Sequence, residues 1–110
     1  MNIQIFGKSK CFDTKKAERY FKERKIKFHR IDIVDIGLSR GEFNSVKSAV
    51  GFDAMLNKSA SGVESITYLA YDTDKEEKLL ENPGFFVTPI VRNGKQATIG
   101  YAPDVWKTWE

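Results

Sequence analysis

Cysteine is almost absent from this chain of 110 residues, and its scarcity excludes one class of small protein at once. Cys11 is the single cysteine, so no internal disulfide can form, and a secreted scaffold held together by disulfides is excluded. Residues 1–6 lack the basic and apolar stretches of a signal peptide, and no run approaches the roughly 20 apolar residues of a membrane span. We therefore expect a soluble protein of the reducing cytoplasm with no membrane segment.

Residues that hold metals or phosphates are equally scarce. His29 is the only histidine, and no cluster of cysteine and histidine has the spacing of metal ligands. Gly7-Lys8-Ser9-Lys10 lacks the spacing of a phosphate-binding loop. The sequence therefore predicts no metal site and no bound cofactor, and it favours a structural role for His29.

Neither sign of charge is in large excess over the other. Eighteen basic residues against fifteen acidic ones give a net charge of +3, which by itself does not indicate a nucleic-acid-binding protein. Much of the basic excess lies in residues 8–30. This stretch is either the solvated face of a helix or a site for an anion or an acidic partner.

The composition is that of one compact domain. Hydrophobic residues make up 41% of the chain and charged residues 30%, which excludes a disordered or low-complexity protein. The length suits a single domain with a core of its own. We expect one domain over residues 1–110, without repeats or linkers, and a monomer.

The first third reads as strand, helix, strand. Residues 2–6 and 28–33 alternate polar and apolar side chains, which predicts two strands. Between them, Asp13 or Thr14 is a candidate cap for a helix that should end near residues 24–25, with apolar positions spaced three and four apart. A helical crossover of this length predicts parallel strands and a right-handed connection.

The middle third reads as helical. Ser39 and Glu42 form a capping box ahead of a helix over about residues 40–50. Two or three short helices should follow within residues 52–82, one of them starting near Asp72. The stop at Asn82-Pro83-Gly84 predicts that the sheet resumes over residues 85–87.

The last third reads as a hairpin and a closing helix. Asn93-Gly94 between two apolar runs predicts a two-residue hairpin with a type I′ turn. Pro103 at a first-turn position should open a short helix that packs Val105, Trp106 and Trp109. The whole order predicts an α/β fold, a thioredoxin-like mixed sheet with flanking helices and a helical subdomain over about residues 38–82.

Cys11 lies where thioredoxin-like domains carry their nucleophile, just before a helix. The free N–H groups and the partial positive charge of a helix N-terminus favour the thiolate, and Lys8 and Lys10 should act in the same direction. The alternative is a partly buried cysteine with a structural role only.

Thr14 stands three residues after Cys11, so the second thiol of a Cys-x-x-Cys pair is missing. Its hydroxyl either hydrogen-bonds the Cys11 thiolate or caps the helix. Any redox cycle must then use an outside thiol such as glutathione or glutaredoxin. Thr88-Pro89 is a candidate cis peptide that would present backbone groups to a docked peptide or glutathione beside Cys11.

As a set, three segments resemble the ArsC/Spx family, which joins glutaredoxin-dependent arsenate reductases and Spx regulators. They are Ile5-Phe6-Gly7 leading to residues 11–17, Leu38-Ser39-Arg40-Gly41-Glu42, and Thr88-Pro89 through Lys95. The resemblance runs almost end to end. It implies a thioredoxin-like sheet interrupted by a helical subdomain, a reactive thiol at Cys11 and a cis-proline at Pro89.

The chain departs from the family's arsenate reductases in the three arginines that hold the oxyanion around the cysteine. The corresponding stretches here are Leu56-Asn57-Lys58-Ser59, Thr88 and Gly100-Tyr101-Ala102-Pro103, none of which contains arginine. Lys58 or Arg92 would have to compensate. The substrate-binding candidates are accordingly Thr88, Pro89, Asn57 and Lys58, and arsenate reduction is the least favoured of three interpretations.

The other two interpretations differ in whether the thiol reacts. Spx regulators dock on the RNA polymerase α-subunit, and the resemblance implies a thiol-independent docking role through the basic face of residues 15–30. The favoured interpretation is an arginine-poor member of the family, a thiol-dependent reductase in which Cys11, Thr14, Lys8 and Lys10 form the catalytic group.

Overall fold

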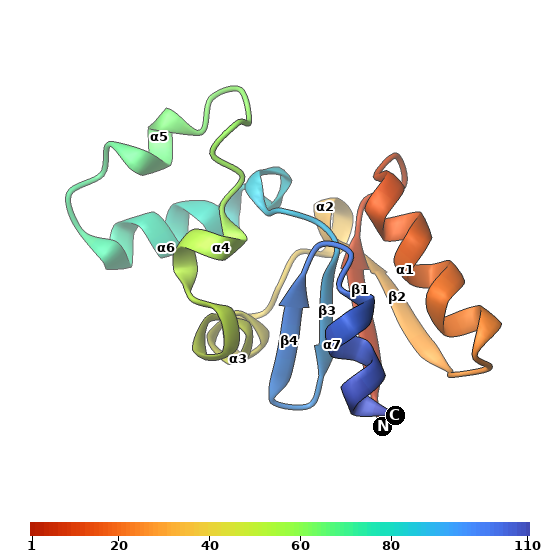
Figure 1. Ribbon diagram of the computed structural model, residues 1–110. Coiled ribbons are helices and arrows are strands. Elements are labelled where there is room, and N and C mark those ends of the chain that lie inside the picture. The colour runs from red at the N-terminus through yellow and green to blue at the C-terminus, as the bar shows by residue number, and fades with distance from the viewer.

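The computed structural model describes residues 1–110 and is built on a mixed four-stranded sheet in the order β2-β1-β3-β4 (Figure 1). β1 (Ile3–Gly7) pairs in parallel with β2 (Phe28–Asp32). On its other side β1 pairs antiparallel with β3 (Ile90–Asn93), which in turn pairs antiparallel with β4 (Gln96–Ile99). The predicted mixed sheet and its parallel first pair are confirmed.

One face of the sheet is covered by α1 (Phe12–Glu23) and by the C-terminal α7 (Pro103–Trp106) with the 3-10 turn η2 (Lys107–Trp109) (Figure 1). A core cluster joins them to the sheet, and its members are Ile3, Ile5, Ala17, Tyr20, Phe21, Val91 and Trp106. The helical spacing predicted Ala17, Tyr20 and Phe21 as the inner face of α1, and all three are buried. Val105 was expected to pack, but it lies on the outer side of α7 and is 44% exposed.

The start of α1 differs from the expectation. The N-cap residue is Cys11, in extended conformation with φ −87° and ψ 118°, and not Asp13 or Thr14. Asp13 instead lies in the first turn, where a carboxylate suits the helix dipole. Thr14 is buried in the first turn of α1, and its hydroxyl does not cap the helix.

Five helices lie between β2 and β3. They are α2 (Ile33–Ile36), α3 (Arg40–Val50), α4 (Phe52–Met55), α5 (Glu64–Thr67) and α6 (Asp72–Glu81). The capping box at the start of α3 is present, with Ser39 and Glu42 bonded reciprocally. The helix α2 was not predicted: β2 ends at Asp32 because that side chain caps the N–H groups of Val34 and Asp35.

We call the stretch from α2 to α6, residues 33–81, the helical segment. A second core cluster lies between it and the opposite face of the sheet. Phe6 of β1 and Ile90 of β3 pack there with ten residues from α2 through Phe86, among them Phe43, Met55 and Leu79. As a result α3 covers the sheet, while α4, α5 and α6 extend beyond its edge (Figure 1). The helical segment therefore shares its core with the sheet.

The segment from Pro83 to Pro89 contains no strand, contrary to the expectation that the sheet resumes at Phe85. It forms the 3-10 turn η1 (Pro83–Phe85), followed by a single bridge between Phe86 and Leu56. Val87 donates its N–H to the carbonyl of Met55 at 2.8 Å. This segment therefore hydrogen-bonds to the helical segment and does not add a strand to the sheet. The Thr88-Pro89 peptide is cis, and β3 begins directly after it.

The predicted β3–β4 hairpin is present, but its turn is shifted by one residue from Asn93-Gly94 and has another type. Asn93 pairs with Gln96, so the two turn residues are Gly94 and Lys95. Gly94 has φ +61°, and Lys95 is not among the residues with positive φ. A positive φ at the first turn position alone is the signature of type II′, whereas the predicted type I′ requires it at both.

No helix of this chain has the length and apolar character needed to cross a bilayer.

Candidate functional site around Cys11

Cys11 lies at the junction of the β1–α1 loop and α1, and its thiol is only partly exposed. The loop is held by a hydrogen bond from the Cys11 N–H to the carbonyl of Lys8 at 3.1 Å. The Cys11 Sγ lies 3.6 Å from the Thr88 carbonyl oxygen, next to cis-Pro89. The structure thus brings together Cys11, Thr14, Thr88 and Pro89 from two segments more than seventy residues apart in sequence.

The environment of Cys11 favours the thiolate. Burial raises the pKa of the thiol, but hydrogen bonds from the side chains of Thr14 and Thr88 and from the backbone of Thr14 and Asp13 outweigh burial. The pKa of Cys11 therefore lies below its usual value. The backbone contribution arises because an N-cap residue faces the free N–H groups of the first helical turn.

Thr14 occupies the third position of α1 and is 1% exposed. Its Oγ1 accepts a hydrogen bond from the Lys8 N–H at 3.4 Å, and the hydroxyl also lowers the pKa of Cys11. Of the two roles expected for Thr14, the helix cap is wrong, because Cys11 is the N-cap residue, and the hydrogen bond to the thiolate stays a prediction. Thr14 also fixes the geometry of the loop, because it holds the backbone of Lys8 against α1.

Lys8 and Lys10 were expected to stabilise the thiolate by charge. The Lys8 ammonium group donates to the carbonyl oxygens of Gly84 (2.9 Å) and Phe86 (3.2 Å), so it joins the β1–α1 loop to the segment ahead of Pro89. Lys10 is exposed and lines a small cavity with Asp32 and Asp35. The largest causes of the shift in the pKa of Cys11 are burial and hydrogen bonds from Thr14, Thr88 and Asp13.

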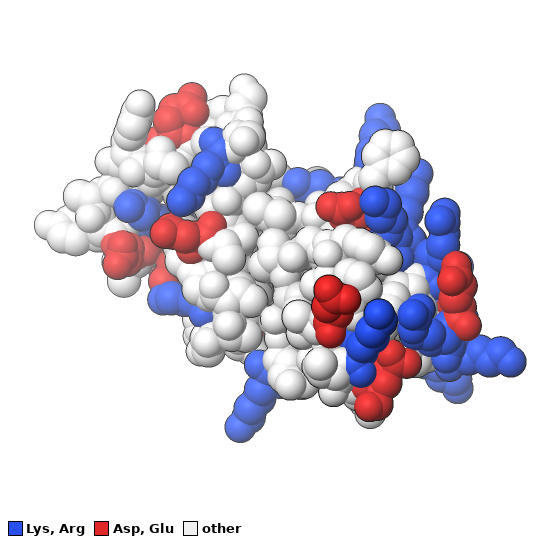
Figure 2. All heavy atoms as spheres, in the orientation of Figure 1, with Lys and Arg blue, Asp and Glu red and all other residues white.

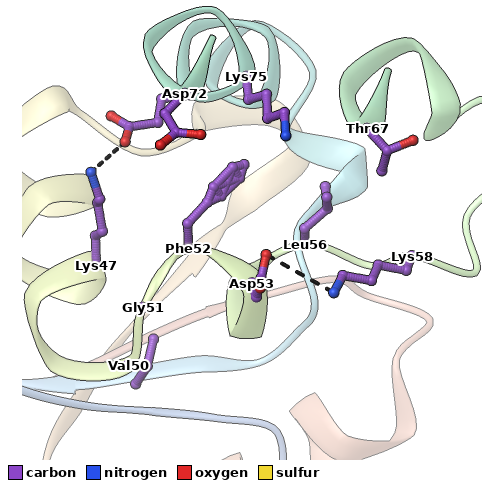
Figure 3. A pocket seen from close by; sticks show the side chains of 11 residues that line it. Lys47, Val50, Gly51, Phe52, Asp53, Leu56, Lys58, Thr67, Asp72 and Lys75 are labelled. Atoms are coloured by element: carbon purple, nitrogen blue, oxygen red, sulfur yellow. Dashed lines mark hydrogen bonds and ion pairs between the residues drawn. The ribbon is translucent and has the colours of Figure 1, made fainter. Parts of the chain in front are cut away.

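Asn57 and Lys58 do not reach the thiol. The Asn57 N–H donates to the Phe85 carbonyl, and its side-chain oxygen accepts from the Ser59 N–H, as in a turn. Lys58 lines a separate cavity of about 580 Å³ in the helical segment, where its Nζ lies 3.9 Å from Asp53 (Figure 3). That cavity is lined by residues 47–76 and does not include Cys11.

No arginine takes the place of the oxyanion-binding arginines. Arg92 donates from Nη1 to the side chain of Gln4 at 2.8 Å and from Nε to Ser45 at 3.3 Å, so it ties β3 to β1 and to α3. The groups that lower the pKa of Cys11 most are hydroxyl and backbone groups.

Two features of the site escaped the sequence analysis. The Thr88 hydroxyl helps to lower the pKa of Cys11, which depends on a loop arrangement that local sequence does not encode. Phe12, which directly follows Cys11 in the sequence, is 80% exposed, although phenylalanine is usually buried. No three histidine, cysteine, aspartate or glutamate side chains are grouped so that they could hold a metal ion, and His29 is exposed on β2.

We expect replacement of Thr14 by valine to raise the pKa of Cys11, because the isosteric side chain cannot hydrogen-bond the thiolate. The same change leaves the Lys8 N–H without its acceptor, which should cost about 1 kcal/mol of unfolding free energy. The pH dependence of iodoacetamide alkylation measures the pKa. Thr14→Ser is the matched control, since it keeps the hydroxyl, and equal pKa values in the two variants would contradict the assigned role.

Solved structures of known proteins resemble this chain over nearly their whole length. An arsenate reductase from Vibrio cholerae superposes with a TM-score of 0.83 at 19% identity, covering 96% of this chain and 94% of that one. A protein from Bacteroides fragilis described as ArsC family related has a TM-score of 0.80 at 18% identity, covering 100% and 98%. The glutaredoxin-like NrdH-redoxin from Escherichia coli has a TM-score of 0.54 at 16% identity, covering 100% and 96%.

At these identities the structural likeness shows the fold, which is thioredoxin-like as the element order predicted. No curated protein matches the chain. The sequence model of the ArsC family matches residues 6–109, which include the β1–α1 loop with Cys11, the helical segment and the cis-proline. On that match, and with the fold in agreement, this chain belongs to the ArsC family.

Proposed function

We propose that this protein is a thiol-dependent reductase that uses Cys11 as its single nucleophile and an external thiol, glutathione or glutaredoxin, as electron donor. The observation that carries the proposal is the thiol at the N-terminus of α1, whose pKa is lowered by the hydrogen bonds around it. A thiolate is the reactive form in thiol–disulfide exchange, so this environment raises the fraction of Cys11 that can attack near neutral pH.

The reaction we propose is a two-step exchange. In the first step the Cys11 thiolate attacks one sulfur of a substrate disulfide, which forms a mixed disulfide on Cys11 and releases the other sulfur as a thiolate. In the second step the thiolate of glutathione or glutaredoxin attacks this mixed disulfide and regenerates the Cys11 thiolate. This second step leaves the donor sulfur joined to the substrate sulfur that Cys11 had held, and a second donor thiolate then attacks that disulfide and releases the substrate thiolate. The substrate disulfide has then gained two electrons, and the two donor sulfurs are joined in a disulfide.

The external donor follows from the chemistry of a single cysteine. Thr14 occupies the position where a second thiol would resolve the mixed disulfide within the protein. Its hydroxyl stabilises the thiolate but cannot carry the electrons of the second step. The second sulfur must therefore come from another molecule.

Thr88 and Pro89 are the proposed substrate-binding residues. The Thr88 carbonyl faces the Cys11 thiol, and the Thr88 N–H makes no hydrogen bond within the protein. The Pro89 carbonyl is already bonded to the Gly100 N–H at 2.8 Å, which fixes this turn against β4. Thr88 can thus offer one donor and one acceptor to the backbone of a peptide-like substrate such as glutathione, placed beside the attacking sulfur.

The experiment that tests this proposal measures the alkylation rate of Cys11 against pH and then the product formed with oxidised glutathione. We expect the pKa to lie below about 8.5, the value of an unperturbed thiol. We further expect a mass increase of one glutathione on the folded protein, removed by reduced glutathione or by glutaredoxin. The Cys11→Ser variant should acquire no adduct. A slow thiol with an unperturbed pKa, or an adduct that no donor removes, would overturn the proposal.

A further inference from the structure

A groove of about 490 Å³ is lined by residues of α1 and of the C-terminal segment around α7, and Cys11 is not among them. Its basic lining residues are Lys16, Arg19, Arg24 and Lys107, and Glu23 is the only acidic one. Tyr20, Tyr101 and Pro103 complete the lining. We call it the cationic groove. Figure 2 shows that basic side chains outnumber acidic ones over α1, although acidic side chains lie among them.

The charge of the cationic groove accounts for the net charge of the whole chain. Its lining carries a net +3, which equals the net charge of the protein, so all other residues are balanced. Two other cavities are balanced in charge. The large one holds three lysines against three carboxylates (Figure 3), and the one beside Lys10 holds two against two.

The cations of the groove are largely free of partners inside the protein. Arg19 and Lys107 make no ion pair and no hydrogen bond through their side chains. Lys16 lies over the Tyr101 ring, 5.5 Å from its centre. Arg24 is the only one of the four in an ion pair: it is stacked on Tyr20 and lies 3.8 Å from Glu110.

The arrangement of these cations is a consequence of helical spacing. Lys16, Arg19 and Glu23 are three and four residues apart along α1, so they share the helix face that borders α7. Lys107 faces them from η2. Two walls of the groove therefore carry positive charge, which favours a ligand that lies between them.

We propose that the cationic groove binds an acidic peptide segment of a partner protein. Carboxylates complement the unpaired cations, and Arg19 can bind one with two parallel hydrogen bonds. The groove also exposes apolar surface, since Tyr101 is 45% exposed and Pro103 lies in the wall. Apolar side chains between the acidic ones would cover that surface, whereas inorganic phosphates or a nucleic-acid backbone would leave it bare.

The test uses a fluorescein-labelled peptide with four glutamates and two leucines, titrated with the full chain at low salt. We expect binding that weakens as salt is added, because exposed charge pairs are screened. The double variant Lys16→Glu/Arg19→Glu should bind the peptide at least about tenfold more weakly. Lys15→Glu/Lys22→Glu is the matched control, with the same charge change at exposed positions of α1 outside the groove. It should retain most of the affinity.

Several results would overturn the proposal. An equal loss of affinity in the control variant would mean that the peptide senses only the overall charge. Tighter binding of tripolyphosphate or of a single-stranded oligonucleotide than of the peptide would assign the groove to phosphates. Dimers that the groove variant abolishes would assign it to a second copy of the chain. Because the groove does not contain Cys11, the Cys11→Ser variant should bind the peptide unchanged, so this test is independent of the proposed reductase function.

Discussion

Replacing Trp106 by alanine is expected to lower the unfolding free energy by about 3–5 kcal/mol, the range measured when large buried aromatic side chains are truncated. Trp106 is fully buried between α7 and the sheet. Its ring contacts those of Tyr20, Phe21 and Tyr101 at centroid distances of 5.1, 5.1 and 5.6 Å. A loss of this size is a large share of the roughly 5–15 kcal/mol that stabilises a typical domain. Urea unfolding followed by circular dichroism measures it.

The variant Trp106→Phe separates packing from hydrogen bonding at this position. The Trp106 indole N–H donates to Thr98 Oγ1 at 2.8 Å, a bond between two buried groups. Phenylalanine keeps most of the apolar contact but leaves the Thr98 hydroxyl without its donor, which should cost about 1–3 kcal/mol. If alanine and phenylalanine destabilise the protein equally, packing of the Trp106 ring is not what holds α7 to the sheet.

The second large effect is expected at Gly7, the last residue of β1. A Cβ atom at this position would lie 2.3 Å from Cγ2 and 2.6 Å from Oγ1 of Thr14. Thr14 is buried and fixed in the first turn of α1, so it cannot move aside freely. Gly7→Ala should therefore push α1 away from β1 and lower the unfolding free energy by about 1–3 kcal/mol, as overpacked cores do. It should also raise the pKa of Cys11, because the Thr14 hydroxyl is displaced from the thiolate.

A double variant tests this explanation. In Gly7→Ala/Thr14→Ala the two closest atoms are removed, and the remaining neighbour is the Thr14 Cβ at 3.0 Å. Stability should recover in part, while the pKa of Cys11 stays high, since the hydroxyl is gone. Such non-additive behaviour is typical of two residues in direct contact. Full stability and an unchanged Cys11 pKa in the single Gly7→Ala variant would refute the steric argument.

The parts of the fold that local sequence determines were predictable. The apolar spacing of Ala17, Tyr20 and Phe21 identified the inner face of α1, and Ser39 with Glu42 marked the start of α3. Each of these signals acts within one or two turns of helix. The helix α2 was not predicted, because at Asp32 a helix cap competes with the alternating pattern of the strand. The Asp32 side chain accepts hydrogen bonds from the next helical turn, which ends β2 and starts α2.

Only the part of the candidate site that lies near Cys11 in the sequence was predictable. The position of Cys11 ahead of a helix follows from residues 2–21, and the thiolate-stabilising role of Thr14 was one of two alternatives for that residue. The contact between Cys11 and Thr88 joins segments 77 residues apart, and no local pattern encodes such a contact. The hydrogen bonds of Lys8 were unpredictable for the same reason, because the carbonyl groups that bind its ammonium group belong to Gly84 and Phe86.

The placement of the two tryptophans decides what intrinsic fluorescence can report. Trp106 and Trp109 both lie in the core between α1, α7 and the sheet, and the helical segment contains neither. An unfolding curve recorded by tryptophan emission therefore follows only that side of the molecule. If the helices from α4 to α6 open first, emission will stay constant while amide hydrogen exchange in those helices accelerates. Coincident transitions by both methods would instead mean that the two sides of the sheet unfold together.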